Sequence, residues 1–319
     1  MIVGSLGALI KPHSFSMLFT ATGFSYICRT KTKYMTKVNA FLIFWLITVV
    51  FLLNACTSPE SSLGNKENST LAKASLVATD TNPAKALTAK AVITIDSTIT
   101  MDYLVGKFKP AKRSDFALIG KPYSSRGGMY LRKEAYDKFV ELAEAAKKDS
   151  LLFIIKSATR NFAAQKVIWE GKWNGKRLLD GNENAKKKYP DPNTRALKIL
   201  EYSSMPGTSR HHWGTDFDVN AFTNAYFEKG KGLKEYEWLV AHADEYGFCQ
   251  PYTQKGEKRP DGYNEEKWHW SYLPIAKELT DQYQLRITNK GISDFEGADT
   301  AEGIEVIRKY VLGINKACL

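Results

Sequence analysis

Several features that mark particular classes of protein are scarce in this 319-residue sequence. Its four cysteines are too few for a disulfide framework, and its length is enough to bury a full core without one. Glycine and proline, at 22 and 11 residues, are too few for a collagen-like fibre. No basic block accompanies the net charge of +11, so a nucleic-acid partner is not expected. The 44% of hydrophobic and 25% of charged residues are typical of a globular protein rather than a polytopic membrane protein or a disordered chain.

One long apolar run is present, and it predicts an export signal. Residues 40–53 read AFLIFWLITVVFLL, with a single threonine as the only polar residue. A run of this length suits the core of a signal peptide, whereas a membrane span needs roughly 18 or more apolar residues. Lys37 supplies the positive flank, and the following LNAC sequence resembles a bacterial lipobox that ends at Cys56. We therefore expect residues 1–56 to be a leader with a lipoprotein-type signal peptide and Cys56 to be lipidated, an uncleaved anchor helix being the alternative.

Either form of leader would place the rest of the chain in the cell envelope, facing the periplasm or the exterior. Met35 stands where a lipoprotein precursor of ordinary length would begin, and one hypothesis is that translation starts there. Residues 57–100 contain no Phe, Tyr or Trp. Such a segment buries too little apolar area to offset its ordering entropy, so we expect a flexible tether between the membrane anchor and the domain.

Residues 101–319 hold 30 of the 39 aromatic residues and are expected to form one domain. Phe217 and Val219 alternate with Asp216 and Asp218, which predicts a strand with one apolar and one polar face. Apolar runs and periodicity predict strands at 151–156 and 215–222 and helices at 131–148, 162–173, 233–246 and 304–314, with another from residue 192. Because no βαβ rhythm is present, an α+β fold is favoured, with a small, mainly antiparallel sheet and flanking helices.

Two of the four cysteines lie in the expected leader, which leaves Cys249 and Cys318 in the domain. An export compartment allows disulfides, and two thiols allow only one pairing. Nothing local in the sequence shows that the two residues are close, so both a disulfide and two free thiols stay open.

Histidine is also scarce, with five in the whole chain, and three of these fall in the short polar segments 209–218 and 265–272. A hydrolytic zinc ion needs three nitrogen or oxygen ligands and an open position for water. His211, Asp218 and His269 supply such a set. Asp218 lies on the polar face of the predicted strand, and the glycine between it and His211 permits a turn that brings the two together.

Glu266 precedes His269 by three residues and is the natural general base for the attacking water. One helical turn would place the two side chains on the same side, whereas an ideal strand would place them on opposite faces. We therefore expect a bend or loop at this point. His212 is expected to point away from the metal, and His242 is interpreted as structural.

These segments together resemble a known family. The pattern S-x-H-x-x-G-x-x-x-D from Ser209, followed by E-x-W-H from Glu266, is similar to the zinc D-alanyl-D-alanine carboxypeptidases and dipeptidases of the vancomycin-resistance type. That group also includes lysostaphin-like peptidases and the hedgehog signalling domain. Residues 157–162 with Gln165 resemble the family's S-G-Y-R-S…Q segment, and the match covers about residues 120–275 with all three motifs in order.

The resemblance implies a role for each group of residues. The three ligands named above would bind one Zn²⁺ per chain, and Glu266 would deprotonate the attacking water. Arg160 would stabilise the oxyanion of the tetrahedral intermediate. Ser209 and Gln165 would line the substrate pocket.

The sequence departs from the family pattern at two points. Asp216 stands where the family usually has Ala, and it would be either a hydrogen-bond partner of a ligand histidine or an alternative ligand. Ala158 and Thr159 replace the Gly-Tyr that precedes the arginine, which leaves the shape of the pocket near Arg160 open.

The expected protein is a lipid-anchored, monomeric zinc peptidase that removes the terminal D-Ala from peptidoglycan stem peptides. The same site would also serve an L,D-endopeptidase or a D,D-dipeptidase, and the long segment 173–206 would decide among them if it narrows the pocket. A catalytically inactive zinc protein that binds muropeptides is the alternative outside enzymes, and the presence of both Glu266 and Arg160 argues against it.

Overall fold

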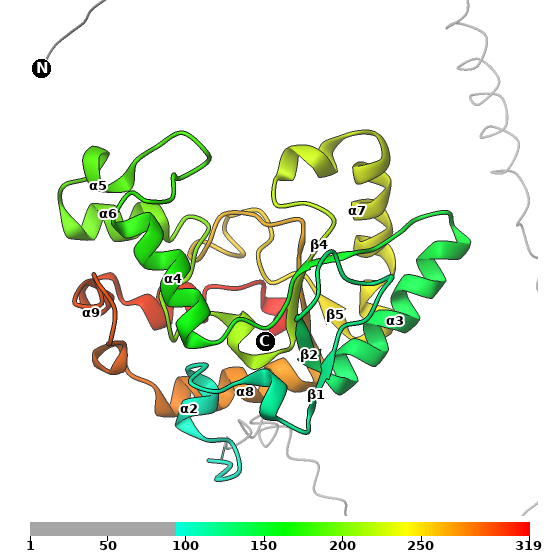
Figure 1. Cartoon of the computed structure of the whole chain (residues 1–319), viewed down its shortest axis with the longest axis horizontal. Helices are drawn as coiled ribbons and strands as arrows, with labels where there is room; N and C mark the ends of the chain where they lie inside the picture. Colours follow the sequence, from blue (N-terminus) through cyan, green and yellow to red (C-terminus); the bar gives the residue numbers. More distant parts are fainter. Residues whose placement is uncertain (1–93) are drawn as a thin grey trace, which may run out of the picture. The chain divides into compact units, whose positions relative to one another are not determined.

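The computed structural model describes residues 94–319, and these are coloured in Figure 1. The predicted leader with Cys56 and nearly all of the predicted tether, residues 1–93, lie outside the described part. The helices are α2 (Met101–Leu104), α3 (Lys133–Lys148), α4 (Phe162–Trp173), α5 (Ala185–Lys188), α6 (Pro192–Ile199), α7 (Gly230–His242), α8 (Leu273–Arg286) and α9 (Thr300–Ile304). The strands are β1 (Phe116–Leu118), β2 (Tyr130–Arg132), β3 (Ile155–Ser157), β4 (Asp216–Val219), β5 (Phe248–Cys249) and β6 (His269–Tyr272).

Single helical turns join these elements: η2 (Pro110–Lys112), η3 (Arg210–Trp213), η4 (Asn224–Glu228), η5 (Ala243–Tyr246), η6 (Asn289–Gly291), η7 (Ile307–Val311) and η8 (Lys316–Cys318). Within residues 94–319, no helix combines the length and the apolar character needed to cross a membrane.

The central sheet has four antiparallel strands in the order β3-β4-β6-β5, and β1 and β2 form a separate antiparallel pair. The apolar face of β4 packs on α3, where Phe217 and Phe139 meet with ring centroids 4.9 Å apart. Val219 and Leu142 belong to the same buried cluster. These observations confirm the predicted α+β fold and the predicted two-faced character of β4.

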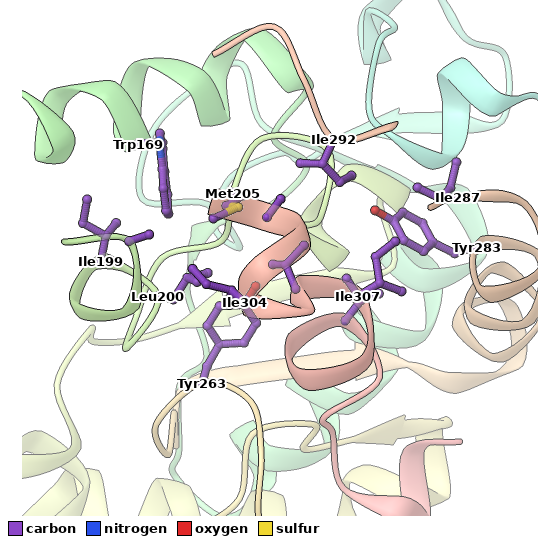
Figure 2. Packing of buried hydrophobic residues seen from close by; sticks show 14 of the residues in the cluster. Trp169, Ile199, Leu200, Met205, Tyr263, Tyr283, Ile287, Ile292, Ile304 and Ile307 are labelled. Carbon is purple, nitrogen blue, oxygen red and sulfur yellow. The ribbon is translucent and has the colours of Figure 1, made fainter. Parts of the chain in front are cut away.

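A second core lies among α2, α4, α5, α6, α8 and α9, whereas α7 packs in the same cluster as α3. Figure 2 shows Ile304 and Ile307 of the C-terminal segment between Trp169 of α4, Ile199 of α6 and Tyr283 of α8. The C-terminal segment is therefore part of the core that supports α4 and α6.

Several predicted elements differ from the observed ones. The strand predicted at 215–222 is limited to β4, and the helix predicted at 233–246 is α7 followed by the turn η5. Tertiary contacts decide the limits of three others. The strand predicted at 151–156 begins only at Ile155, since β4 offers pairing partners from that residue on. The helix predicted from Leu131 begins two residues later, because Leu131 pairs with β1. The single helix predicted at 304–314 is wrong: α9 ends at Ile304, Glu305 adopts a left-handed conformation with φ of 57°, and the separate turn η7 follows.

Cys249 and Cys318 are joined by a disulfide, with their Cα atoms 5.9 Å apart. The bond ties the edge strand β5 to the last turn of the chain, η8. It closes a loop with a sequence separation of 69 residues. In such a long loop, a cross-link removes much of the conformational freedom of the unfolded chain.

Replacing both residues, Cys249→Ala with Cys318→Ala, is expected to lower the free energy of unfolding by about 2–4 kcal/mol because the unfolded chain regains that freedom. Thermal unfolding of the two proteins, with and without a reducing agent, measures the effect. The reductant should destabilise the wild type and leave the double variant unchanged; equal stability of the two oxidised proteins would contradict the structural role.

Candidate active site

Three neighbouring strands carry the polar side chains of the site in one row. Ser157 of β3 lies opposite Asp218 of β4, and Asp218 lies opposite His269 of β6. Residues directly opposite each other on paired strands project to the same face of the sheet. The row therefore lies on the face away from α3, where the alternation in β4 predicts Asp218.

His211 reaches this row through a tight turn between η3 and β4. Gly214 ends η3 with a left-handed φ of 76°, and a Cβ atom at this position would lie 2.3 Å from Cε1 of Phe116. Only glycine fits both the conformation and the close approach. The predicted turn is confirmed, and it brings His211 back towards Asp218.

The three predicted ligands converge. Nε2 of His211 lies 3.4 Å from Oδ2 of Asp218, and Nδ1 of His269 lies 3.0 Å from Oδ1 of the same carboxylate. One ligand atom from each residue lies within 4.8 Å of the others, and all three residues are buried. The two imidazole rings are nearly perpendicular, with centroids 4.7 Å apart. Two imidazole nitrogens and one carboxylate oxygen in this arrangement fit a Zn²⁺ ion with a further position for water.

Hydrogen bonds on the outer side of each imidazole decide which nitrogen faces the centre of the cluster. Nδ1 of His211 lies 3.0 Å from the carbonyl oxygen of Ala158 and donates to it, which leaves the lone pair on Nε2. Nε2 of His269 lies 2.9 Å from Oδ2 of Asp216, so that its Nδ1 faces Asp218. Such partners fix the orientation and tautomer of metal-binding histidines. The cluster is therefore preorganised for a metal ion.

Asp216 occupies the position of a hydrogen-bond partner rather than that of a fourth ligand, because it lies behind His269. Its charge is balanced by Arg210, whose Nε lies 3.2 Å from Oδ2 of Asp216, and both side chains are fully buried. The remaining Arg210 nitrogens donate to the hydroxyl groups of Thr280 and Ser271, and the Ser271 hydroxyl donates to Oδ1 of Asp216. A buried ion pair persists when its hydrogen-bonding groups are satisfied in this way.

The pKa values show that the cluster attracts positive charge. Burial would lower the pKa of His269, but hydrogen bonds to Asp216 and Asp218 outweigh it and raise that pKa to about 9. Burial lowers the pKa of His211 to about 4, so this imidazole is neutral. Burial opposes ionisation of Asp218, yet the neighbouring histidines hold its pKa well below its usual range. The ionised carboxylate of Asp218 thus faces a position that a divalent cation would also favour.

Glu266 lies beside the cluster, at the bend that the sequence predicts. The amide of His269 donates to the carbonyl oxygen of Glu266 at 3.2 Å, which closes a turn directly before β6. Oε2 of Glu266 lies 3.6 Å from Nδ1 of His269. Burial raises the pKa of Glu266 to about 8, against the opposing charges of His269, Arg160 and Lys172. A carboxyl group with such a pKa can both hold and release a proton near neutral pH.

Arg160 and Gln165 lie on the other side of the cluster. Nη1 of Arg160 lies 3.5 Å from Oδ2 of Asp218 and donates to the Ser157 hydroxyl at 2.6 Å. Nε of Arg160 donates to Oε1 of Gln165 at 3.0 Å, and the Gln165 amide donates to the carbonyl oxygen of Ser204 at 2.8 Å. The guanidinium group is thus held in one orientation beside the metal-ligand cluster.

A cavity of about 370 Å³ opens onto these residues. Its lining includes both ligand histidines, Asp218, Glu266, Arg160 and Gln165. It also includes residues that the sequence analysis did not identify: Ile168, Lys172, Asp180, Tyr202, Ser203, Ser204, Phe222, Thr223, Asn224, Tyr252 and Tyr263. Asp180 and residues 202–204 belong to the segment 173–206, whose unusual length was the signal that it could shape the pocket.

Three other predicted residues lie elsewhere. Ser209 is buried, is not among the cavity-lining residues, and its Oγ has no hydrogen-bond partner within the described residues. Its role in substrate binding therefore stays a prediction. His212 points away from the cluster, with Nδ1 at 2.5 Å from the carbonyl oxygen of Arg160. His242 ends α7 on the surface, where it contacts Glu245.

Comparison with known proteins places this site in a family. Residues 128–275 match the family described as "VanY: D-alanyl-D-alanine carboxypeptidase". The chain belongs to this family of peptidases. A relative from Bacillus subtilis, described as "Putative carboxypeptidase YodJ", is 28% identical over 156 residues, which cover 48% of this chain and 50% of the relative. The chain therefore spans about half the length of that protein.

Solved structures with detectable similarity are more distant. The VanY D,D-pentapeptidase of the VanB-type resistance cassette, solved in complex with Zn(II), is 22% identical over 56% of this chain and 89% of its own, with a TM-score of 0.37. The LdcB LD-carboxypeptidase is 21% identical over 64% of this chain and 81% of its own, with a TM-score of 0.41.

The Asp216→Asn variant is expected to bind Zn²⁺ about 10–100-fold more weakly, because the uncharged amide is a poorer partner for Nε2 of His269. Competition with a chromophoric chelator measures the affinity. Asp137→Asn on the exposed side of α3 is the matched control and should bind Zn²⁺ like the wild type. A folded Asp216→Asn protein with wild-type affinity would show that Asp216 does not support the ligand.

Proposed function

We propose that this chain is a zinc carboxypeptidase that removes the terminal D-Ala from peptidoglycan stem peptides. The observation that carries the proposal is the convergence of three buried ligands, Glu266 and Arg160 on one cavity. The family description supplies the substrate class, and the cavity supports hydrolysis because it joins a preorganised metal-ligand set to an acid–base group and a fixed cation.

The proposed reaction divides among residues of the chain. His211, Asp218 and His269 hold the Zn²⁺ ion, which when bound polarises the scissile carbonyl group and makes water more acidic. Glu266 takes a proton from the attacking water and then passes it to the leaving amine, a task that suits a carboxyl group with a raised pKa. Arg160 faces the oxygen on which negative charge develops, and its bonds to Ser157 and Gln165 keep it in place.

The proposal extends to the location of the protein. The signal-peptide pattern and Cys56 support an exported lipoprotein anchored to a membrane of the cell envelope, with residues 57–100 as a tether and residues 101–319 as the catalytic domain. A monomeric protein on such a tether would reach the surrounding peptidoglycan. Labelling with a radioactive fatty acid, lost in Cys56→Ala, tests the anchor.

The Glu266→Gln variant of the full chain is expected to lose about 10²–10⁴-fold in kcat, because the amide cannot accept the proton of the attacking water. A pentapeptide that ends in D-Ala-D-Ala is the substrate, and mass spectrometry of the products measures turnover. The variant should keep its zinc, which a metal analysis of the purified protein verifies.

Glu265→Gln is the matched control, because Glu265 is adjacent in sequence and is not among the cavity-lining residues. It should cleave the pentapeptide at the wild-type rate. A Glu266→Gln protein with full activity would refute the role of Glu266. Release of alanine only from a tetrapeptide would make the chain an L,D-carboxypeptidase, and a cut deeper in the stem would make it an endopeptidase.

A further inference from the structure

One wall of the cavity is a single face of α4. Gln165, Ile168 and Lys172 are spaced by three and four residues, and all three line the cavity. Gln165 and Lys172 are two turns apart, about 10 Å along the helix axis. Arg160 lies two residues before the start of α4 and lines the same cavity as Lys172.

The ammonium group of Lys172 has a fixed position but no carboxylate partner. Its Nζ donates to the hydroxyl group of Ser203 at 2.7 Å. Among residues 94–319, no carboxylate oxygen lies within ion-pair distance of this nitrogen, whereas Lys166 on the outer face of the same helix lies 3.6 Å from Glu170. Lys172 is thus a positioned cation that faces the cavity without a neutralising contact.

The surroundings of Lys172 favour an incoming anion. Burial lowers its pKa, although the more distant carboxylates of Asp180 and Glu266 oppose the shift. A partly buried cation that lacks a partner is poorly solvated, and a bound carboxylate would replace the lost hydration with a charge-assisted hydrogen bond. The Ser203 hydroxyl, which accepts from Lys172, would keep its own proton to donate to the same anion.

The segment 173–206 contacts both this cation and the side chain that orients Arg160. Ser203 and Ser204 are both nearly buried, and the carbonyl oxygen of Ser204 accepts from the amide of Gln165 at 2.8 Å. Gln165 in turn accepts from Arg160 at 3.0 Å. Two adjacent residues of the segment therefore bind the two groups: Ser203 binds Lys172, and Ser204 binds Gln165, the partner of Arg160.

We propose that Lys172 and Ser203 form the subsite that binds the C-terminal carboxylate of the peptide substrate. The inference rests on the proposed function and adds the reason why the enzyme acts at chain ends. In a peptidase that removes a single residue, the terminal carboxylate is separated from the scissile carbonyl by one residue. Lys172 lines the same cavity as Arg160 and the metal-ligand cluster, and its partner Ser203 adjoins Ser204, which binds Gln165 beside Arg160. An endopeptidase, which cleaves within a chain, does not need a subsite for a terminal carboxylate.

The test compares the full-length wild type with Lys172→Met, Lys172→Arg and Lys166→Met. Each protein is assayed with a D-Ala-D-Ala pentapeptide as the free acid and as the C-terminal amide. For the acid, Lys172→Met should raise KM about 10–100-fold with little change in kcat, because one charged hydrogen bond is lost. Lys172→Arg should recover part of the loss, and Lys166→Met should behave like the wild type.

The amide substrate separates binding of the carboxylate from other effects. Loss of Lys172 also removes a positive charge near Glu266, but that change would affect the acid and the amide equally. The wild type should prefer the acid, and Lys172→Met should lose this preference. Equal preference in the two proteins, or an equal loss on both substrates, would overturn the assignment.

Two further arms complete the test. One arm uses a peptide whose side-chain carboxylates are amidated. If the increase in KM of Lys172→Met is absent only with this peptide, Lys172 binds a side chain, and the C-terminal assignment is wrong. Calorimetric titration of zinc-loaded proteins with both peptides measures the subsite without turnover. Binding of the acid that weakens in Lys172→Met, without cleavage by the wild type, would support the subsite and count against the proposed function. Absence of binding to the wild type would overturn both.

Discussion

The register between β4 and β6 is the constraint on which the rest of the site depends. It places Asp218 opposite His269 and Asp216 opposite Ser271, so that the polar side chains of both strands lie on one face of the sheet. A shift by one residue would turn every one of these side chains to the other face and would bring Phe217 out of its contact with α3. The packing of the apolar face therefore specifies the position of the metal ligands, and the stability of the core and the geometry of the site are set by the same pairing.

Charge balance behind His269 is the second requirement. Asp216 is buried and holds His269 in orientation, which is tolerable only because Arg210 is buried beside it and is itself hydrogen-bonded by Ser271 and Thr280. These residues come from η3, β4, β6 and α8. The departure from the family pattern at Asp216 is thus accompanied by a set of partners that surround it, and α8 contributes to the site although none of its residues reaches the cavity.

The cavity combines two kinds of structure with different tasks. The strands, the turn at Gly214 and the turn before β6 supply the ligands and Glu266, whereas α4 and the segment 173–206 supply other lining residues, including Lys172 and Ser203. Figure 1 shows α4, α5 and α6 on one side of the sheet strands and α7 on the other. Under the proposed function, the chemistry of hydrolysis would depend on the sheet and its flanking turns, and the choice of substrate would depend on the segment that follows α4.

The sequence alone predicted the ligand set, Glu266 and the alternating strand β4, because these follow from residue types that zinc chemistry requires and from the period of a strand. Arg160 was predicted only from the resemblance to the family motif. Helix α4 was predicted with its observed limits, since its apolar pattern and its capping residue are local. The limits of β3 and the break at Glu305 were not predictable, because strand pairing and core packing decided them. The disulfide, the ion pair behind His269 and the contact between Lys172 and Ser203 each join residues whose proximity no local pattern records. Only the tertiary structure brought them together, because burial in a shared core, rather than spacing along the chain, determines which distant polar groups become partners.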